Sequence, residues 1–246
     1  MRLERTVFTY PRYVRKFMRC FALLFLFFGF SGSTYAQENE DTFSGSTNYL
    51  EDQFYMGITY NFLLDKPVDV TQRNLSYGLQ AGFIRDIPVN PDRTVALGLG
   101  LGYNLNSYYS NLRATESGDD VIYDVLDGDA DFKRSKVETH LIEVPLEFRW
   151  RNSTASSYKF WRVYTGLRFG YVVGGRSKFV SDSGDFSFYN DDIRRFQYGL
   201  TFNFGYNTFN IHLYYSLNNL FNDDVFVNGS EISMRPLRIG LIFYIL

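Results

Sequence analysis

The sequence predicts an all-β protein, an eight-stranded antiparallel transmembrane β-barrel preceded by a signal peptide. Three observations lead to this fold class. Runs of alternating apolar and polar residues recur along the chain, and they are longer than ordinary strands of about five or six residues. The polar connections between these runs alternate between long and short. Aromatic residues make up 19% of the chain, a share that suits strands facing lipid and bordered by aromatic belts.

Residues 1–36 have the parts of a secretory signal peptide. Arg and Lys residues crowd the first 19 positions, an apolar run follows over residues 20–30, and small residues lead to Ala36. The apolar run is too short to cross a membrane as a helix, which needs about 20 residues. We expect cleavage after Ala36, with Met1 and Met18 both candidate start residues. Because Cys20 is the one cysteine, the mature protein is expected to have neither disulfides nor cysteine-ligated metals.

The predicted mature chain is acidic. Six of the 25 Lys+Arg and one of the 27 Asp+Glu lie in residues 1–36, which leaves 19 and 26 and a net charge of −7. This charge argues against nucleic acid as a partner. The polar stretch 37–52 predicts a flexible periplasmic segment. Residues 53–246 are then predicted to form one barrel domain.

The hairpin at 136–175 shows the strand pattern most clearly. Apolar residues from Ile142 to Trp150 occupy every second position, with charged residues or proline between them. Successive side chains on a strand point to opposite faces, so each run has an apolar and a polar face. Apolar side chains outward and polar ones inward are typical of a transmembrane barrel, although a soluble β-sandwich shares the alternation. Strands are predicted at 54–64, 75–83, 95–105, 136–151, 160–175, 195–206, 210–217 and 237–245.

The connection lengths favour the barrel over the sandwich. Outer-membrane barrels have short periplasmic turns and longer outer loops, whereas a β-sandwich has no reason to sort its loops this way. We therefore expect an outer-membrane location with both termini in the periplasm. The long polar connections are 65–74, 107–135, 176–193 and 218–234, and the short ones are 87–93, 152–159 and 207–209.

Charged residues recur on the predicted inward face. Eight strands leave an interior just wide enough for side chains to fill it, and an unpaired buried ion costs several kcal/mol. We interpret these residues as a plug of ion pairs that fixes the shape of the barrel; a gated narrow conduit is the alternative. The plug residues are Glu143, Glu147, Arg149, Arg162, Arg168, Arg195 and Arg238.

Aromatic residues flank the predicted strands at both ends. Trp150 and Trp161 lie on either side of a short turn, and Tyr108 and Tyr109 lie at the opposite end of the third strand. Trp and Tyr favour the interface between lipid and water. These four residues are therefore predicted to anchor the barrel at the two membrane surfaces.

Two constellations point weakly to metal or catalytic chemistry. Asp127, Asp129 and Asp131 have the spacing of a calcium loop, but Phe132 stands where its sharp-turn glycine belongs, so a solvated acidic loop is expected. His212 and Ser216 share a strand face, yet four residues span about 13 Å along a strand, too far for a nucleophile and its base. We therefore expect no catalytic residues, no metal and no cofactor.

Four short segments of the chain read RDIP, ALGLGLGY, IEVPLEFRW and KFWRVYTG. They resemble the PorT family of outer-membrane barrels in Bacteroidetes. The resemblance extends over nearly all of the predicted mature chain. It implies participation in the type IX secretion system, and it brings no catalytic residues. The expected partners are outer-membrane lipid, lipopolysaccharide and other proteins of the secretion machinery; a small passive porin and a lipid-modifying enzyme are the alternative functions. The segments that carry the resemblance are 85–88, 96–103, 142–150 and 159–166.

Binding is expected on the loops, since loops on a rigid scaffold carry most recognition. The longest predicted loop, 107–135, contains an apolar run at 121–126 within an acidic segment. An exposed apolar run rimmed by charge indicates a partner contact. Folding back over the mouth of the barrel is the second interpretation of the same run.

Overall fold

The computed structural model describes residues 52–118, 120–127, 132–152, 161–182, 184–206 and 209–245. The predicted signal peptide and nearly all of the segment 37–52 lie outside these residues. So do most of the acidic run 127–131 and most of the turn 152–159. No helix in the described part of the chain is long and apolar enough to cross a membrane.

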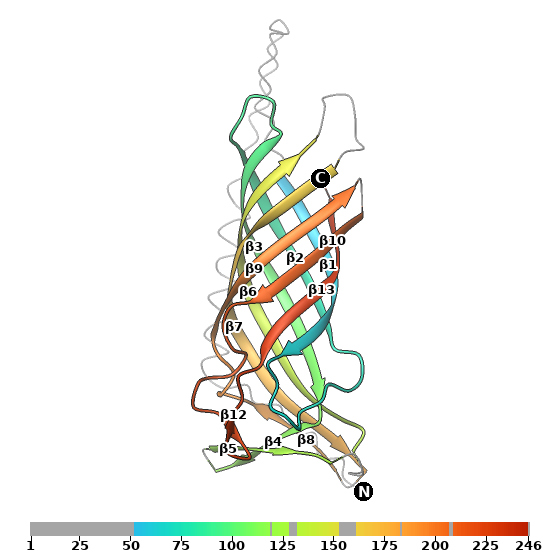
Figure 1. Ribbon diagram of the computed structural model, residues 1–246, viewed down its shortest axis with the longest axis vertical. Helices are drawn as coiled ribbons and strands as arrows, with labels where there is room; N and C mark the ends of the chain where they lie inside the picture. Colours follow the sequence, from blue (N-terminus) through green and yellow to red (C-terminus); the bar gives the residue numbers. More distant parts are fainter. Residues whose placement is uncertain are drawn as a thin grey trace, which may run out of the picture. The chain divides into compact units, whose positions relative to one another are not determined.

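Eight long strands form a closed antiparallel barrel (Figure 1). Each strand pairs with its neighbours in chain order, and β13 pairs with β1, with Phe54 opposite Ile245, to close the ring. The predicted all-β eight-stranded barrel is confirmed. Its strands are β1 (Asp52–Leu64), β2 (Tyr77–Pro88), β3 (Val95–Ser110), β6 (Arg134–Arg151), β7 (Trp161–Ser181), β9 (Phe196–Tyr206), β10 (Phe209–Ser216) and β13 (Arg235–Ile245).

The long connections gather at one end of the barrel and the short ones at the other (Figure 1). β1 begins and β13 ends at the short-connection end. The long connections carry secondary structure that the sequence did not indicate, because β3, β6 and β7 continue into them. They also contain the short strands β4 (Leu112–Ser117), β5 (Asp120–Val125), β8 (Gly184–Tyr189), β11 (Phe226–Val227) and β12 (Ser230–Glu231).

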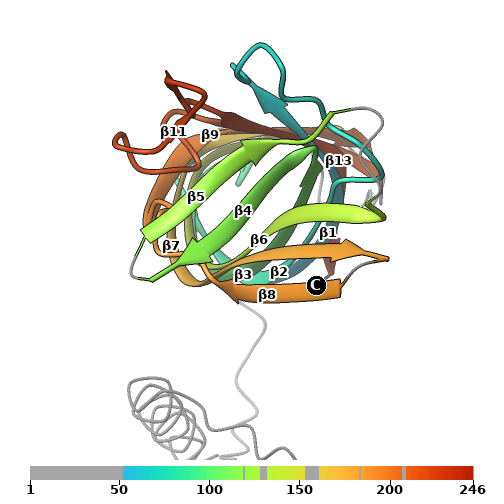
Figure 2. The same ribbon diagram turned by 90° about the horizontal axis from the view of Figure 1, so that it is seen from below.

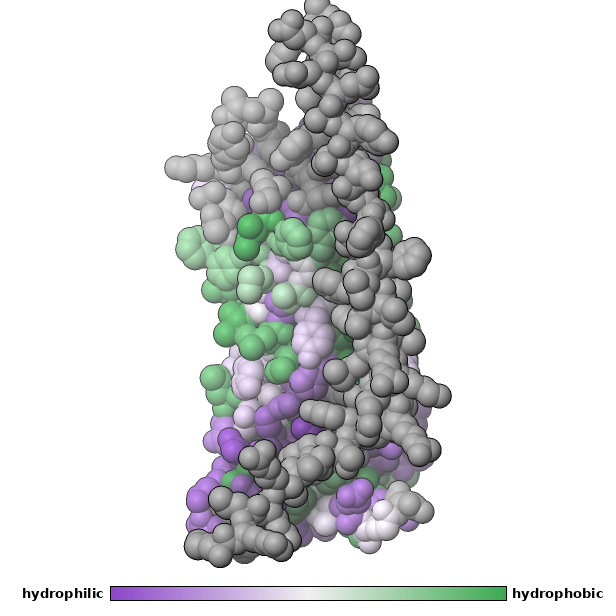
Figure 3. Space-filling model, turned by 180° about the vertical axis from the view of Figure 1, so that it is seen from behind, coloured by the Kyte–Doolittle hydropathy of each residue, from purple (hydrophilic) through white to green (hydrophobic). Residues whose placement is uncertain are grey.

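The barrel is apolar outside and polar inside, the reverse of a soluble core. On β9 every second side chain from Phe196 to Tyr206 is exposed and apolar, and the positions between them are buried. Figure 3 shows hydrophobic side chains over the middle of one face and hydrophilic ones toward the long-connection end. Because lipid tails solvate such a wall and water does not, this pattern is that of a membrane-embedded barrel.

A β-bulge interrupts the long β6–β7 ladder. The register between these strands shifts at His140 and Leu141, which pair with Gly174 and Val172. One extra residue, Val173, therefore lies on β7. It reverses the alternation beyond this point, so that odd-numbered side chains such as Ser177 face inward on the outer part of β7.

Two inward glycines make room for an aromatic ring in the lumen. A Cβ atom at Gly82 would lie 2.6 Å from the hydroxyl of Tyr55, and one at Gly102 would lie closer still. Tyr55 itself is buried near the start of β1. The glycines of β2 and β3 thus let this ring lie against the barrel wall.

Candidate functional site

The first group of lumen charges lies near the short connections. Asp86 on β2 contacts Arg149 through Oδ1 and Arg151 through Oδ2, the latter at 2.9 Å. Arg149 also donates a hydrogen bond of 2.8 Å to Gln53. The side chains of the three charged residues are at most 2% exposed. One carboxylate thus holds two guanidinium groups away from water.

The second group lies at the middle of the lumen around Glu143 on β6. This carboxylate contacts Arg168 at 3.3 Å and Arg238 at 3.1 Å, and it accepts a hydrogen bond of 3.2 Å from Asn104. Gln80 accepts a further hydrogen bond from Arg168. Strands β2, β3, β6, β7 and β13 all contribute to the group, so it ties opposite walls of the barrel together.

Glu147 joins the two groups into one network. Its carboxylate lies 3.5 Å from Arg168 of the middle group and 3.6 Å from Arg149 of the first group. Its side chain is 1% exposed. A continuous set of charges therefore spans the barrel interior from β2 to β13.

The excess of arginine over carboxylate in this network is met by aromatic faces. The guanidinium carbon of Arg238 lies 3.6 Å from the ring centre of Tyr214, and that of Arg149 lies 3.9 Å from Tyr164. A cation over an aromatic face gains about 2 kcal/mol or more when water is excluded. The tyrosines fill the space and stabilise the surplus positive charge.

Six of the seven residues predicted for the plug lie inside the barrel and are buried: Glu143, Glu147, Arg149, Arg162, Arg168 and Arg238. Arg162 lies closer to the short connections, 5.9 Å from the ring centre of Tyr244.

The placement of Arg195 inside the barrel is wrong. Its side chain is 61% exposed and pairs with Asp191 at 2.6 Å outside the lumen. β9 begins one residue later, at Phe196, so the alternation that placed Arg195 inward does not yet apply. The alternation of inward and outward side chains applies only to residues that are paired within the barrel sheet.

Sequence reasoning missed Asp86 and Arg151. The alternation on β2 continues inward through Ile84 to Asp86, which a longer reading of that run would have found. The prediction ended the strand at residue 83 and placed a turn from residue 87, where Pro88 follows. Arg151 lay at the end of a predicted strand, but without Asp86 it had no partner to suggest its role.

The long-connection end of the lumen is closed by an apolar cluster. It joins side chains of the barrel strands to side chains of all the long connections. Tyr108 is one of them and is 2% exposed, so its prediction as an interfacial anchor is wrong. Its neighbours in the cluster are Leu63, Val70, Leu112, Ala114, Tyr123, Val137, Leu141, Val172, Ile193, Leu220, Phe221, Val225, Val227, Ile232 and Met234.

The hairpin β4–β5 lies across the mouth of the barrel (Figure 2). The ring of Tyr123 packs edge-on against Phe221 at 5.6 Å, and its hydroxyl donates a hydrogen bond of 2.9 Å to Asp192 and accepts one of 2.8 Å from Asn190. Burial raises the pKa of the Tyr123 hydroxyl, so it stays a donor. Of the two interpretations of the run 121–126, folding back over the mouth is the one observed, although Ile122 remains 51% exposed.

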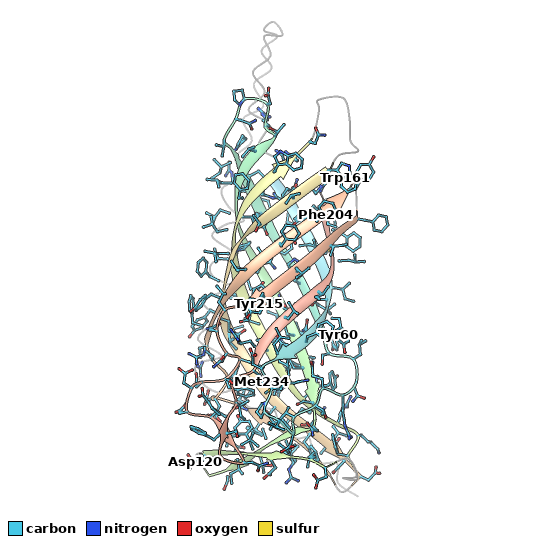
Figure 4. All side chains as sticks on the ribbon, in the orientation of Figure 1. Tyr60, Asp120, Trp161, Phe204, Tyr215 and Met234 are labelled. Carbon is cyan, nitrogen blue, oxygen red and sulfur yellow. The ribbon has the colours of Figure 1, made fainter. Side chains whose placement is uncertain are left out.

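Aromatic side chains lie on the outer wall at two levels (Figure 4). Near the short connections Trp150 and Trp161 are 42% and 47% exposed, and Trp161 stacks on Phe204 at 5.2 Å. Toward the long connections Figure 4 shows Tyr60 and Tyr215 on the outer wall, while Tyr109 is half-buried. The tryptophans lie where the sequence predicted them.

The described residues hold no cluster of three or more His, Cys, Asp or Glu side chains that could bind a metal ion. His212 hydrogen-bonds Asn203 at 2.6 Å, while Ser216 donates to the carbonyl oxygen of Asn218 at 2.9 Å. Each of the two side chains thus has its own partner, and they do not form a nucleophile–base pair.

No curated protein sequence matches this chain. Among solved structures, it is similar to Ail, the attachment invasion locus protein of Yersinia pestis, at 14% identity over 78% of this chain and 97% of that one, with a TM-score of 0.27. A mutant of the Rhodopseudomonas blastica porin matches at 10% identity over 80% of this chain and 100% of that one, with a TM-score of 0.20.

One protein family matches the chain over most of its length. The family described as "Outer membrane protein beta-barrel domain" matches residues 35–222, which is more than half of the chain. This match agrees with the closed barrel, its apolar outer wall and its polar interior. The chain therefore belongs to the family of outer-membrane β-barrel proteins.

Proposed function

We propose that this outer-membrane barrel is a non-enzymatic, non-conducting accessory of protein secretion, in the manner that its resemblance to the PorT family implies. One observation carries the proposal: the lumen is filled by an ion-pair network at its middle and covered by an apolar cluster at its mouth. A barrel filled in this way acts through its surface, and the long connections form the largest structured surface outside the wall.

The filled lumen favours this proposal over a passive porin. A conducting pore needs a continuous column of water, whereas Glu143, Glu147 and Arg168 meet across the middle of the barrel. Eight-stranded barrels have interiors that side chains just fill. Planar-bilayer recordings of the purified protein are expected to show no stepwise conductance, and reproducible single-channel steps would favour the porin.

The proposed orientation places the long connections at the cell surface and both chain ends in the periplasm. It rests on the sorting of long and short connections to opposite ends and on the general rule for outer-membrane barrels. In this orientation the hairpin β4–β5 and the extended β7–β8 hairpin face the outside of the cell. They are available to secreted proteins or to surface components of the machinery.

The test is deletion of the gene, followed by proteomics of the secreted fraction and analysis of the lipopolysaccharide. The proposal expects cargo proteins to be retained in the cell while lipopolysaccharide is unchanged. Complementation by the wild-type gene should restore secretion. Normal secretion in the deletion strain would reduce the protein to a structural barrel, and altered lipid modification would favour an enzyme.

A further inference from the structure

At the long-connection end, β6 and β7 extend beyond the part of the barrel in which all eight strands are paired. The last pair joining β7 to β9 is Tyr171 with Phe196, yet β6 and β7 remain paired as far as Arg134 and Val180. β8 then pairs with the outer part of β7. Figure 1 shows these strands running past the barrel toward the lower end of the view.

The outward face of this extension carries a concentration of positive charge. Lys136 on β6 lies directly opposite Lys178 on β7. Arg176 lies on the same face of β7, two residues closer to the barrel. Arg134 lies on the same face of β6, two residues further out. Like charges directly opposite each other destabilise a sheet, so the fold by itself does not explain the arrangement. We call Arg134, Lys136, Arg176 and Lys178 the basic cluster.

Two acids lie on the face of the basic cluster: Glu138, opposite Arg176, and Asp185 of β8, opposite Val180. Glu138 is the one acid on this part of the β6 face, and its carboxylate contacts Lys136 and His140. Within the described ranges, no carboxylate forms an ion pair with Arg134, Arg176 or Lys178.

Two aromatic rings hold cations of the cluster in place. The ammonium group of Lys136 lies 5.7 Å from the ring centre of Tyr109, and the guanidinium of Arg176 lies 4.9 Å from that of Tyr189. A ring face attracts a cation and leaves its charge in place. The cluster is therefore ordered on one side. Its outward charge comes mainly from Arg134, Arg176 and Lys178, because the Lys136 side chain is 13% exposed and paired with Glu138.

The basic cluster lies just outside the apolar belt. On the same outward face of β6, the side chains become apolar at Ile142 and Val144. Glu138, which lies opposite Arg176, is four residues from Ile142, and Lys136 is six residues from it, about 13 and 20 Å along a strand. The difference in height is smaller because barrel strands tilt. This level is that of the lipid headgroups in the leaflet next to the long connections.

An apolar groove lies on the lipid-facing wall formed by β1, β2, β3 and β13, and its wall residue Leu105 lies opposite His140, four residues from Lys136 of the cluster. The groove has a volume of about 450 Å³, and its walls include Met56, Ile58, Leu79 and Leu105. Tyr103, also in the groove wall, hydrogen-bonds His140, which in turn contacts Glu138. An apolar groove on the same outer wall, on the membrane side of a group of cations, fits an amphiphile with a phosphate head and an acyl chain better than it fits a soluble anion.

We propose that the basic cluster binds the phosphate groups of lipopolysaccharide in the outer leaflet and that the groove on the same outer wall accepts one of its acyl chains. Arginine offers a planar fork of donors to phosphate oxygens, and lysine offers a compact charge. The site rests on the proposed orientation of the barrel, and it is independent of the proposed role in secretion.

The test measures binding of lipid A to the protein refolded in detergent micelles. Phosphorylated lipid A should bind about tenfold more tightly than phosphatase-treated lipid A, because charge-assisted hydrogen bonds to phosphate are lost. The double variant Arg176→Gln/Lys178→Gln should show the same loss toward phosphorylated lipid A. The matched control Lys66→Gln/Arg235→Gln removes one lysine and one arginine where β1 and β13 meet, away from β6 and β7, and should bind as the wild type does.

Several outcomes would overturn the proposal. Equal binding of phosphorylated and phosphatase-treated lipid A by the wild type would do so without any variant, even if the double variant failed to assemble. Equal loss in the control variant would mean that net charge alone drives binding. Full competition by millimolar inorganic phosphate would assign the cluster to a soluble anion. Surface labelling tests the orientation separately, and secretion assays test the function separately.

Discussion

At the scale of single residues, the lumen is held by a few carboxylates that each serve two arginines. Asp86 contacts Arg149 and Arg151, and Glu143 contacts Arg168 and Arg238. Removing one partner of a buried ion pair is more costly than exposing a surface charge, because the remaining ion is left without compensation in a medium of low dielectric constant. The shared carboxylates are therefore the most sensitive positions in the barrel.

The variant Glu143→Gln keeps the shape of the side chain and removes its charge. It should lower the free energy of unfolding by about 3 kcal/mol, because Arg238 loses its carboxylate and Arg168 keeps only Glu147. Urea unfolding in lipid vesicles measures the change. Glu116→Gln, on an exposed residue of β4, is the control and should leave stability unchanged. Equal stability of both variants would mean that water solvates the lumen charges individually.

Space around Tyr55 is a second sensitive feature. Gly102→Ala places a Cβ against the Tyr55 hydroxyl and should cost about 1–3 kcal/mol, the usual penalty for overpacking. Gly174→Ala is the control, because its Cβ would meet His140 at an ordinary 3.6 Å. Heat-modifiability on gels reports assembly and urea unfolding reports stability. A Gly102→Ala barrel as stable as the control would show that the ring shifts without cost.

At the scale of elements, the long connections act as a cover for the barrel. β4 and β5 pair with each other along their whole length, and their inward side chains join the apolar cluster. The exposed tip of the hairpin carries polar residues from Glu116 to Gly118. This hairpin is held by apolar contacts, by the Tyr123 hydroxyl and by a hydrogen bond from Ser135 to the Leu112 carbonyl oxygen. It is expected to open locally more easily than the membrane strands do, because those are paired along both edges.

The variant Tyr123→Phe should loosen this cover without unfolding the barrel. It removes the hydrogen bonds to Asp192 and Asn190, at a cost of about 1–2 kcal/mol, so the hairpin should open roughly tenfold more often. Limited proteolysis within β4–β5 measures the opening. Tyr189→Phe, whose ring is 48% exposed on β8, is the control and should be cleaved at the wild-type rate. Equal cleavage of both variants would show that apolar packing alone holds the cover.

At the scale of the whole molecule, the barrel has two different ends. One has short connections and exposed tryptophans, and the other has the covered mouth, the β7–β8 extension and the basic cluster. Because the ends differ this strongly, the direction of insertion determines which surface meets which compartment. Both functional proposals therefore depend on the proposed orientation, because it determines which compartment the long connections and the basic cluster face.

Epitope insertions test the orientation in intact cells. A tag after Gly118, at the tip of β4–β5, should be accessible to antibody at the cell surface, and a tag within 153–157 should become accessible only after the outer membrane is opened. A known periplasmic protein serves as the control for membrane integrity. The reverse labelling would invert the topology while leaving the barrel fold intact.

The sequence by itself determined the barrel and most of its polarity. Alternation from Ile142 to Trp150 was enough to place Glu143, Glu147 and Arg149 inside, because a paired strand leaves its side chains only two directions. The same rule failed at Arg195, which precedes the paired part of β9, and it missed Asp86, which lies beyond a strand end read too early.

Only the tertiary structure decided which charges meet and what covers the mouth. The partners of Glu143 come from β7 and β13, and Tyr123 reaches Phe221 from a connection about a hundred positions away in the chain. The alternation pattern shows which side chains of a strand face the lumen. It does not show how far along the barrel axis each of these side chains lies. That position follows from the register and tilt of all eight strands together, which are set by closure of the ring.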